Sequence, residues 1–250
     1  MRFKKINHSI VTALRKYGIV VTRLSSSPEG RLGCLLKTYN IEIVLDVGAN
    51  IGQYAKMLRQ ELDYDGIIHS FEPMKSEYFE LQKTARNDPK WKVDNCGLGD
   101  VDAEMVINIA GNSASSSLLA ASKRLLSVAP QVAYVGNERV QIHKLDTIYN
   151  EQQLKGQRVF LKIDAQGYES KILRGAKQSL QYIDTLQLEM ALTPMYEDEL
   201  LFEDYFSMMH ANGYYFVHLM PGLWDTKTGE LLEVDGIFHR YSPNNESEIN

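Results

Sequence analysis

A strand, a glycine-containing turn and a helix follow one another in the stretch VLDVGANIGQYA, residues 44–55, and this stretch restricts the fold more than any other. The apolar run around Asp46 leads into a turn with Gly48 and Gly52, after which a helical pattern begins. Glycines in such a turn let the backbone approach a ligand more closely than a Cβ atom would allow. The stretch therefore predicts the start of an α/β sheet with a ligand at this turn.

Strand and helix patterns alternate from about residue 41 onward, which is typical of α/β folds. Predicted strands cover residues 43–47, 66–71, 91–96, 158–163, 185–190, 214–219 and 234–238, and predicted helices cover 53–62, 76–86 (with Ser76 as N-cap), 169–180 and 200–211. Residues 104–109 and 138–142 alternate like strands of a small antiparallel insertion. The short connections elsewhere predict parallel strands joined by right-handed crossovers.

The length of 250 residues fits one domain with additions. We expect a helical N-terminal extension over residues 1–36, an α/β domain over 37–241 and a flexible polar tail over 242–250. The turn-forming residues 25–30 would separate the extension from the domain.

The N-terminal extension is basic and amphipathic. It contains Arg2, Lys4, Lys5, Arg15, Lys16 and Arg23, and its apolar residues Phe3, Ile6, Ile10, Leu14 and Tyr17 recur at helical spacing. A secretory signal would need an uninterrupted apolar stretch and a cleavage site, and both are missing. Two interpretations stay open. A helix docked on the domain is favoured, because such stripes are usually packing faces; the alternative is a helix in peripheral contact with a membrane surface.

Composition bears on location and partners. The net charge of −5 offers no general basic surface, so we expect no nucleic-acid partner. Cys34 and Cys96 form neither a disulfide framework nor a zinc motif, which suits a reducing cytoplasm. No apolar run approaches the ~18 residues of a membrane span. These observations predict a cytoplasmic protein without an integral membrane segment.

A second acid, Glu72, follows the next predicted strand 20 residues beyond Gly52, where Rossmann-type sheets place the acid that binds ribose hydroxyls. The turn has the spacing GxxxG instead of the GxGxxG of dinucleotide sites, and Asp46 precedes it. An acid there would repel a pyrophosphate but would suit the cationic ammonium and sulfonium groups of S-adenosylmethionine. The alternative is a junction with purely structural glycines and a solvated Glu72.

With these motifs the chain resembles the FkbM family of S-adenosylmethionine-dependent methyltransferases. The resemblance covers roughly residues 41–240 and rests on VLDVGANIGQYA, HSFEP, NCGLGD, SSSLL, LDTI, LKIDAQGYESKILRGA, LQLEMALTPMYEDE and VDGIFHR. It implies a Rossmann-like class I methyltransferase fold, with a seven-stranded, mostly parallel sheet whose last strand is reversed. It also implies O-methylation, often of sugars or complex natural products.

The resemblance also implies roles for individual residues. Asp46, Gly48, Asn50 and Gly52 match the loop around the methionine part of the cofactor, Glu72 matches the ribose acid, and Asn95, Cys96, Gly97 and Leu98 match the region beside adenine. Many family members carry Glu where this chain has Gln166, so Gln166 is assigned no chemical role.

An acid–base cluster is predicted where the acceptor would bind. Asp164 follows one predicted strand, Glu189 lies near the end of the next, and Lys162 points to the same face as Asp164. Asp164 is our first choice for the base that takes the proton of an acceptor hydroxyl. The alternatives are that Asp164 caps the following helix and that Lys162 pairs with Glu189. A carboxylate-bound Mg²⁺ is left open, whereas the scattered histidines argue against a histidine metal site.

Other functions are compatible with some of the same sequence motifs. A nicotinamide-dependent oxidoreductase is disfavoured by the GxxxG spacing. A binding module that has lost catalysis, and a methyltransferase acting on nitrogen, both stay open. The acceptor is expected to be a small molecule or a glycan.

Overall fold

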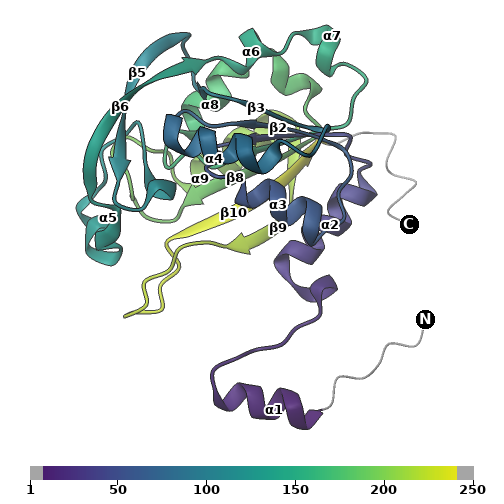
Figure 1. Cartoon of the computed structure of the whole chain (residues 1–250), viewed down its shortest axis with the longest axis vertical. Helices are drawn as coiled ribbons and strands as arrows, with labels where there is room; N and C mark the ends of the chain where they lie inside the picture. The colour runs from purple at the N-terminus through teal and green to yellow at the C-terminus, as the bar shows by residue number, and fades with distance from the viewer. Residues whose placement is uncertain (1–7, 241–250) are drawn as a thin grey trace.

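The computed structural model describes residues 8–240, and its main body is an α/β domain built on one large sheet (Figure 1). The strands of this sheet are β1 (Ile43–Val47), β2 (Ile67–Phe71), β3 (Trp91–Asp94), β7 (Val159–Ile163), β8 (Thr185–Ala191), β9 (Tyr214–Pro221) and β10 (Glu233–Arg240). Their order is β3-β2-β1-β7-β8-β10-β9. The pairs from β3 to β8 are parallel, and β10 is antiparallel to both neighbours. The expected seven-stranded sheet with one reversed strand is confirmed.

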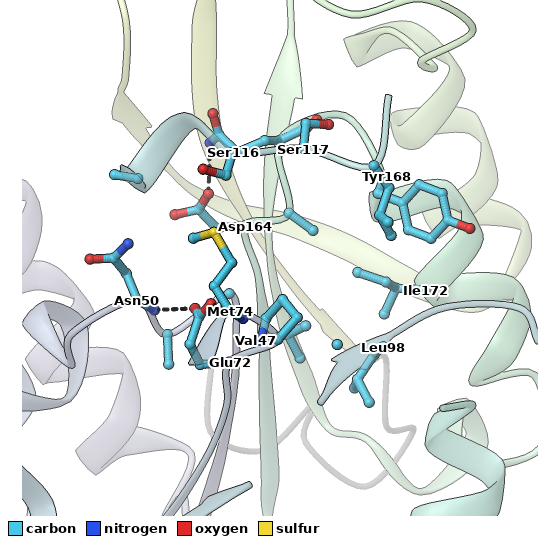
Figure 2. Close-up of a pocket in the computed structure, with 18 of the residues that line it drawn as sticks. Val47, Asn50, Glu72, Met74, Leu98, Ser116, Ser117, Asp164, Tyr168 and Ile172 are labelled. Atoms are coloured by element: carbon cyan, nitrogen blue, oxygen red, sulfur yellow. Dashed lines mark hydrogen bonds between the residues drawn. The ribbon is translucent and has the colours of Figure 1, made fainter. Parts of the chain in front are cut away.

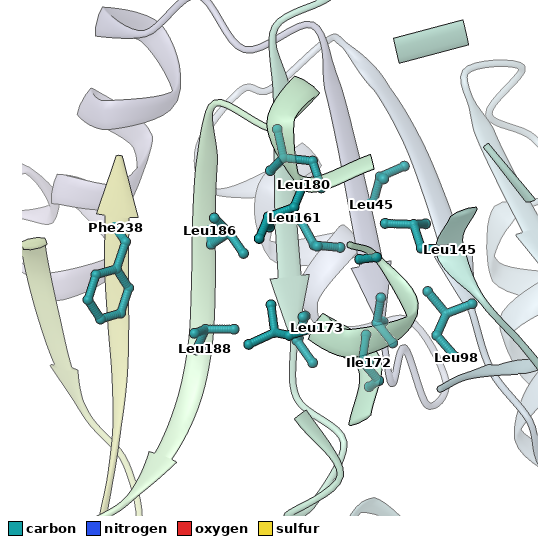
Figure 3. Close-up of a cluster of buried hydrophobic side chains, with 14 of the residues drawn as sticks. Leu45, Leu98, Leu145, Leu161, Ile172, Leu173, Leu180, Leu186, Leu188 and Phe238 are labelled. Atoms are coloured by element: carbon teal, nitrogen blue, oxygen red, sulfur yellow. The ribbon is translucent and has the colours of Figure 1, made fainter. Parts of the chain in front are cut away.

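Helices cover both faces of the sheet. They are α2 (Pro28–Thr38), α3 (Gln53–Gln60), α4 (Lys75–Ala85), α6 (Leu145–Ile148), α7 (Glu151–Leu154), α8 (Glu169–Gly175) and α9 (Phe202–Ala211), with a 3-10 turn η4 (Ser179–Tyr182). One buried cluster joins α2, α3 and α4 to the sheet, and another joins α8 and α9 to the opposite face. Figure 3 shows the second cluster, in which Leu161 and Leu188 of the strands pack near Ile172 and Leu173 of α8.

The predicted antiparallel insertion is also present. β5 (Ala103–Ala110) and β6 (Tyr134–His143) form an antiparallel pair, and the short strand β4 (Gly97–Leu98) runs parallel to β6. Between β5 and β6 lie η2 (Ser113–Ser115), α5 (Lys123–Val128) and η3 (Pro130–Val132). Residues 113–117, which we name the roof segment, belong to this insertion.

Several predicted boundaries differ from the structure. The third predicted strand ends at Asp94, and helix α4 begins one residue earlier than expected, with Met74 instead of Ser76 as N-cap. Helix α8 ends at Gly175, five residues early. A Cβ atom at Gly175 would lie 1.8 Å from the carbonyl oxygen of Gly99, so this glycine permits a close backbone contact where the helix stops.

Helix α2 was not predicted, because its sequence PEGRLGCLLKT begins with turn-forming residues. Ser27 caps it by accepting a hydrogen bond from the N–H of Gly30 at 3.0 Å, and Pro28 occupies its first turn. Leu32 and Leu36 are buried in the cluster on its face of the sheet. Packing of these two leucines, rather than helix propensity, explains why the segment is helical.

The favoured interpretation of the N-terminal helix was wrong. Helix α1 (His8–Lys16) lies apart from the body of the molecule, connected to α2 by an extended segment and the 3-10 turn η1 (Leu24–Ser26) (Figure 1). Tyr17, expected on its packing face, is 82% exposed. The part of the prediction that concerns Phe3 and Ile6 lies outside the described residues, as does that for the tail 242–250. Within the described part of the chain, every helix is too short or too polar to span a bilayer.

Candidate active site

A cavity of about 440 Å³ opens at the carboxyl edge of the sheet, where β1, β2 and β7 end. Figure 2 shows Asn50 and Glu72 on one side, Leu98 and Ile172 on another, and Ser116 and Ser117 of the roof segment across from them. Ligands of open α/β sheets bind at this edge, and small-molecule sites commonly measure ~300–1,000 Å³. The cavity is therefore the candidate site.

The turn after β1 forms part of the cavity wall. Gly48 has φ +75°, and a Cβ atom there would lie 1.9 Å from the carbonyl oxygen of Asp164. This glycine thus allows the loops after β1 and β7 to touch. Gly52, at φ +87°, does not line the cavity, and a Cβ atom there would meet the Trp91 ring at 2.9 Å. Both glycines serve close packing, and Gly48 also lines the cavity.

Glu72 lines the cavity and is only 3% exposed. Its two carboxylate oxygens accept hydrogen bonds from the backbone N–H groups of Asn50 at 2.8 Å and Met74 at 2.9 Å. Burial raises the pKa of Glu72 to about 7, although these two hydrogen bonds oppose the change. Each oxygen retains a free lone pair, so the carboxylate can still accept ligand hydroxyl groups.

The predicted adenine region is divided by the structure. Gly97 and Leu98 line the cavity. Asn95 instead supports the wall, since its side-chain amide donates to the carbonyls of Glu72 at 2.9 Å and Pro73 at 3.0 Å. Cys96 is buried in the core, where burial raises the pKa of its thiol to about 12. Cys96 therefore packs as a neutral side chain.

Asp46 is fully buried and does not line the cavity. One carboxylate oxygen accepts from the Ser70 hydroxyl at 3.0 Å, and the other lies 3.4 Å from Nζ of Lys162. Lys162 also lies 3.3 Å from Asp164, and its Nζ donates to the carbonyls of Val47 and Gly48, both at 3.4 Å. Burial lowers the pKa of Lys162, but the Asp164 and Asp46 carboxylates outweigh it, so the pKa lies above its ordinary value. Lys162 is a buried cation that ties β1 to β7.

Asp164 lines the cavity, and its side chain is 36% exposed. It does not cap α8: Tyr168 is the N-cap residue, and the Glu169 carboxylate accepts from the N–H groups of Ala165 and Gly167. The alternative pairing of Lys162 with Glu189 is not observed either, because Lys162 pairs with Asp46 and Asp164. Asp164 is thus free of both structural tasks and faces the cavity.

Gln166, which was assigned no chemical role, forms hydrogen bonds to several side chains at the acceptor end of the site. Its Nε2 donates to Asp164 at 3.0 Å and to Glu189 at 2.8 Å, while its Oε1 accepts from the Tyr196 hydroxyl at 2.8 Å. Its backbone carbonyl accepts from the Ser117 hydroxyl at 2.7 Å. Burial, reinforced by Asp164, raises the pKa of Glu189 well above its ordinary value. The backbone of Gln166 has φ +55°, a sparsely populated conformation that the surrounding contacts hold in place.

Asp235 of β10 is a second cavity residue that was not singled out. It accepts from Nε2 of Gln187 at 3.1 Å, and Gln187 accepts in turn from the Tyr54 hydroxyl at 2.8 Å. Burial raises the pKa of Asp235 to about 6. Its place in the VDGIFHR motif was the signal that could have found it.

Metal binding gains no support from the donor geometry. Across residues 8–240, no group of three or more His, Cys, Asp or Glu side chains is arranged to hold a metal ion. The structure therefore gives no support to the carboxylate-bound Mg²⁺ considered from the sequence.

The sheet, its reversed strand and the cavity at its carboxyl edge define a Rossmann-like fold of the class I methyltransferase type. The chain belongs to the FkbM methyltransferase family, since the Methyltransferase FkbM domain model matches residues 46–216. No curated protein matches the chain significantly.

Several solved structures are similar to this chain at low sequence identity. The methyltransferase FkbM from Methylobacillus flagellatus KT is 15% identical with a TM-score of 0.48; the match covers 79% of this chain and 44% of that one, so this chain spans less than half of that protein. A putative O-methyltransferase from Klebsiella pneumoniae is 13% identical with a TM-score of 0.48, covering 94% and 89%. Magnesium protoporphyrin IX methyltransferase from Synechocystis PCC 6803, solved with bound SAM, is 11% identical with a TM-score of 0.47, covering 94% and 92%.

Proposed function

We propose that this chain methylates a hydroxyl group of a sugar, a polysaccharide or a natural product, with S-adenosylmethionine as the methyl donor. The observation that carries the proposal is the cavity joining the buried acid Glu72 after β2 to the partly exposed carboxylate of Asp164 after β7. Family membership supports methyl transfer.

The cavity walls fit this cofactor. Glu72 would accept hydrogen bonds from the ribose hydroxyls, Leu98 and Ile142 would contact the adenine ring, and Gly48 and Asn50 would border the methionine part. When bound, the cofactor supplies a methyl group on a positively charged sulfur, which is an excellent leaving group. Asp46 does not line the cavity, and its role would be to hold Lys162 and β2 in place.

Asp164 is the proposed base. A hydroxyl in the cavity can reach its carboxylate, which Gln166 and Lys162 hold from the other side. Lys162 carries a proton already and cannot accept another, and burial beside Asp164 raises the pKa of Glu189, which favours its protonated form, so Asp164 is the better candidate for this task. Positioning of the acceptor would provide much of the rate, and the base a further ~10²–10⁴-fold.

The remaining expectations stay predictions. They are a cytoplasmic location, a hydroxyl rather than a nitrogen acceptor, and the lack of a nucleic-acid partner.

A thermal-shift comparison of S-adenosylmethionine, S-adenosylhomocysteine, NAD and buffer tests the proposed cofactor. A ligand at about 100 times its Kd adds ~2.7 kcal/mol to the free energy of unfolding, which a melting curve resolves. We expect both adenosyl compounds to raise Tm and NAD to leave it unchanged. Stabilisation by NAD alone would contradict the proposal.

A further inference from the structure

Residues 8–24, which we name the N-terminal arm, expose apolar side chains next to one another. The arm lies apart from the body of the molecule (Figure 1). Tyr17 is 82% exposed, Val20 76%, Leu24 49%, Ile19 48% and Val21 38%. Five large apolar side chains are thus solvent-exposed within eight consecutive residues, which marks an interaction surface.

The charge of the same region has one sign. Residues 1–28 include Arg2, Lys4, Lys5, Arg15, Lys16 and Arg23, whereas all 32 Asp and Glu residues lie beyond residue 28. Arg15 and Lys16 end helix α1, directly before the exposed apolar run. A bilayer surface with anionic headgroups attracts such cations while its interior accepts the neighbouring apolar side chains.

We propose that the N-terminal arm binds an anionic bilayer surface and tethers the catalytic domain to it. This inference does not depend on the proposed reaction. Elsewhere in residues 8–240, strongly exposed apolar side chains such as Phe79 of α4 and Val135 of β6 are on separate elements. Two arms of the same positive charge would repel one another, whereas an anionic bilayer attracts them, which favours a lipid occupant over self-association.

Sedimentation of the full chain with vesicles tests the proposal. We expect binding to vesicles of phosphatidylcholine with phosphatidylglycerol and little binding to pure phosphatidylcholine. Arg15→Glu with Lys16→Glu should weaken binding by about 25-fold or more, because each basic residue near an anionic surface contributes about fivefold. Tyr17→Ser with Val20→Ser should also weaken it, by about tenfold, because the apolar contact is lost. The four substituted side chains are all exposed, so the fold should be retained.

A matched control separates the arm from general charge. Arg174 and Lys177 are exposed basic residues on and after α8, and Arg174→Glu with Lys177→Glu makes the same charge change away from the arm. This control should bind vesicles as the unchanged chain does. Equal losses in the control and the arm variant would overturn the proposal, as would unchanged binding of both arm variants.

Self-association is measured on the same proteins by light scattering. We expect the same molar mass for the unchanged chain and for Tyr17→Ser with Val20→Ser. A concentration-dependent dimer that these substitutions abolish, without vesicle binding, would assign the arm to a second copy and overturn the lipid proposal. Because cofactor binding is tested separately by melting curves, failure of either proposal leaves the other standing.

Discussion

Glu72 illustrates how burial sets the chemistry of a single residue. Its carboxylate is held by two backbone N–H groups, and its pKa of about 7 places its ionisation in the physiological range. The ionised form accepts hydrogen bonds at both oxygens, whereas the protonated form carries a donor on one of them. Cofactor binding through this residue should therefore respond to pH.

We expect the affinity for S-adenosylmethionine to rise as the pH increases to about 7 and then to level off, because Glu72 is protonated at lower pH. Glu72→Gln should lower the affinity at pH 8 by ~10–100-fold, the usual value of hydrogen bonds to a charged group. Titration calorimetry between pH 5.5 and 8 measures both effects. Glu80→Gln, on the exposed side of α4, is the control and should behave as the unchanged chain does. An unaltered affinity in Glu72→Gln would place the ribose contact elsewhere.

A second prediction about a single residue concerns Asp164. Asp164→Asn keeps the shape of the side chain but removes its basicity, so turnover should fall by ~10² or more while cofactor affinity stays within a few-fold. A screen of sugar and polyketide hydroxyls supplies the acceptor for the assay. Asp198→Asn, in an exposed turn, is the control. Near-normal turnover of Asp164→Asn would leave positioning as the source of the rate.

The contacts of Gln166 could not be predicted from the sequence. The motif LKIDAQGYE pointed to Asp164, but the role of Gln166 depends on its φ of +55° and on partners 23 and 30 residues away, Glu189 and Tyr196. Asp46 shows the opposite case. Its type and spacing suggested a cofactor contact, whereas its burial beside Lys162 is a property of the packed sheet.

At the scale of elements, the N-terminal arm and helix α2 should affect different properties. Removing most of the arm should leave cofactor binding unchanged, whereas weakening α2 should lower stability. We expect a chain that begins at Arg23 to bind S-adenosylmethionine with unchanged affinity, because residues 8–22 line no part of the cavity. Leu32→Ala in α2 should instead lower the free energy of unfolding by ~2–5 kcal/mol, since Leu32 is fully buried. Calorimetry and urea denaturation measure the two effects. Loss of cofactor binding in the shortened chain with a normal circular dichroism spectrum would show that the arm completes the site.

The strands were the most predictable elements, because buried runs such as 43–47 and 159–163 carry the signal of a parallel sheet in their composition. Helix α2 was missed because Pro28, Gly30 and Gly33 have low helix propensity and only tertiary packing makes the segment helical. The docked position of α1 was wrongly predicted from its apolar stripe, which shows amphipathicity but not what covers the apolar face.

At the scale of the whole molecule, buried acids make stability depend on pH. Burial raises the pKa of Glu72 and Glu233 to about 7 and that of Glu169 to about 8. The folded protein therefore binds these protons more tightly than the unfolded chain, and stability falls as the pH rises towards these values. His239, whose pKa burial lowers to about 4, has the opposite effect, but its contribution is complete above about pH 6.5.

We therefore expect the free energy of unfolding to fall by about 3–4 kcal/mol between pH 6.5 and 8.5, at ~1.4 kcal/mol per unit of pKa difference. Urea denaturation across this range measures the slope. Glu169→Gln should reduce the slope, because Glu169 titrates latest of the three acids. A stability that rises over this range would contradict the assignment of these acids as buried and protonated.

The roof segment is attached unequally at its two ends. Ser117 is 1% exposed and bonded to Gln166, whereas the tip reaches the cavity floor through one hydrogen bond, from Nδ2 of Asn50 to the Ser113 hydroxyl at 3.2 Å. Such a bond contributes ~1 kcal/mol net, so losing it at the Ser113 end costs less free energy than freeing the buried Ser117 end. We expect the roof segment to yield first at Ser113 when cofactor is exchanged, while the Ser117 end keeps the acceptor side in place.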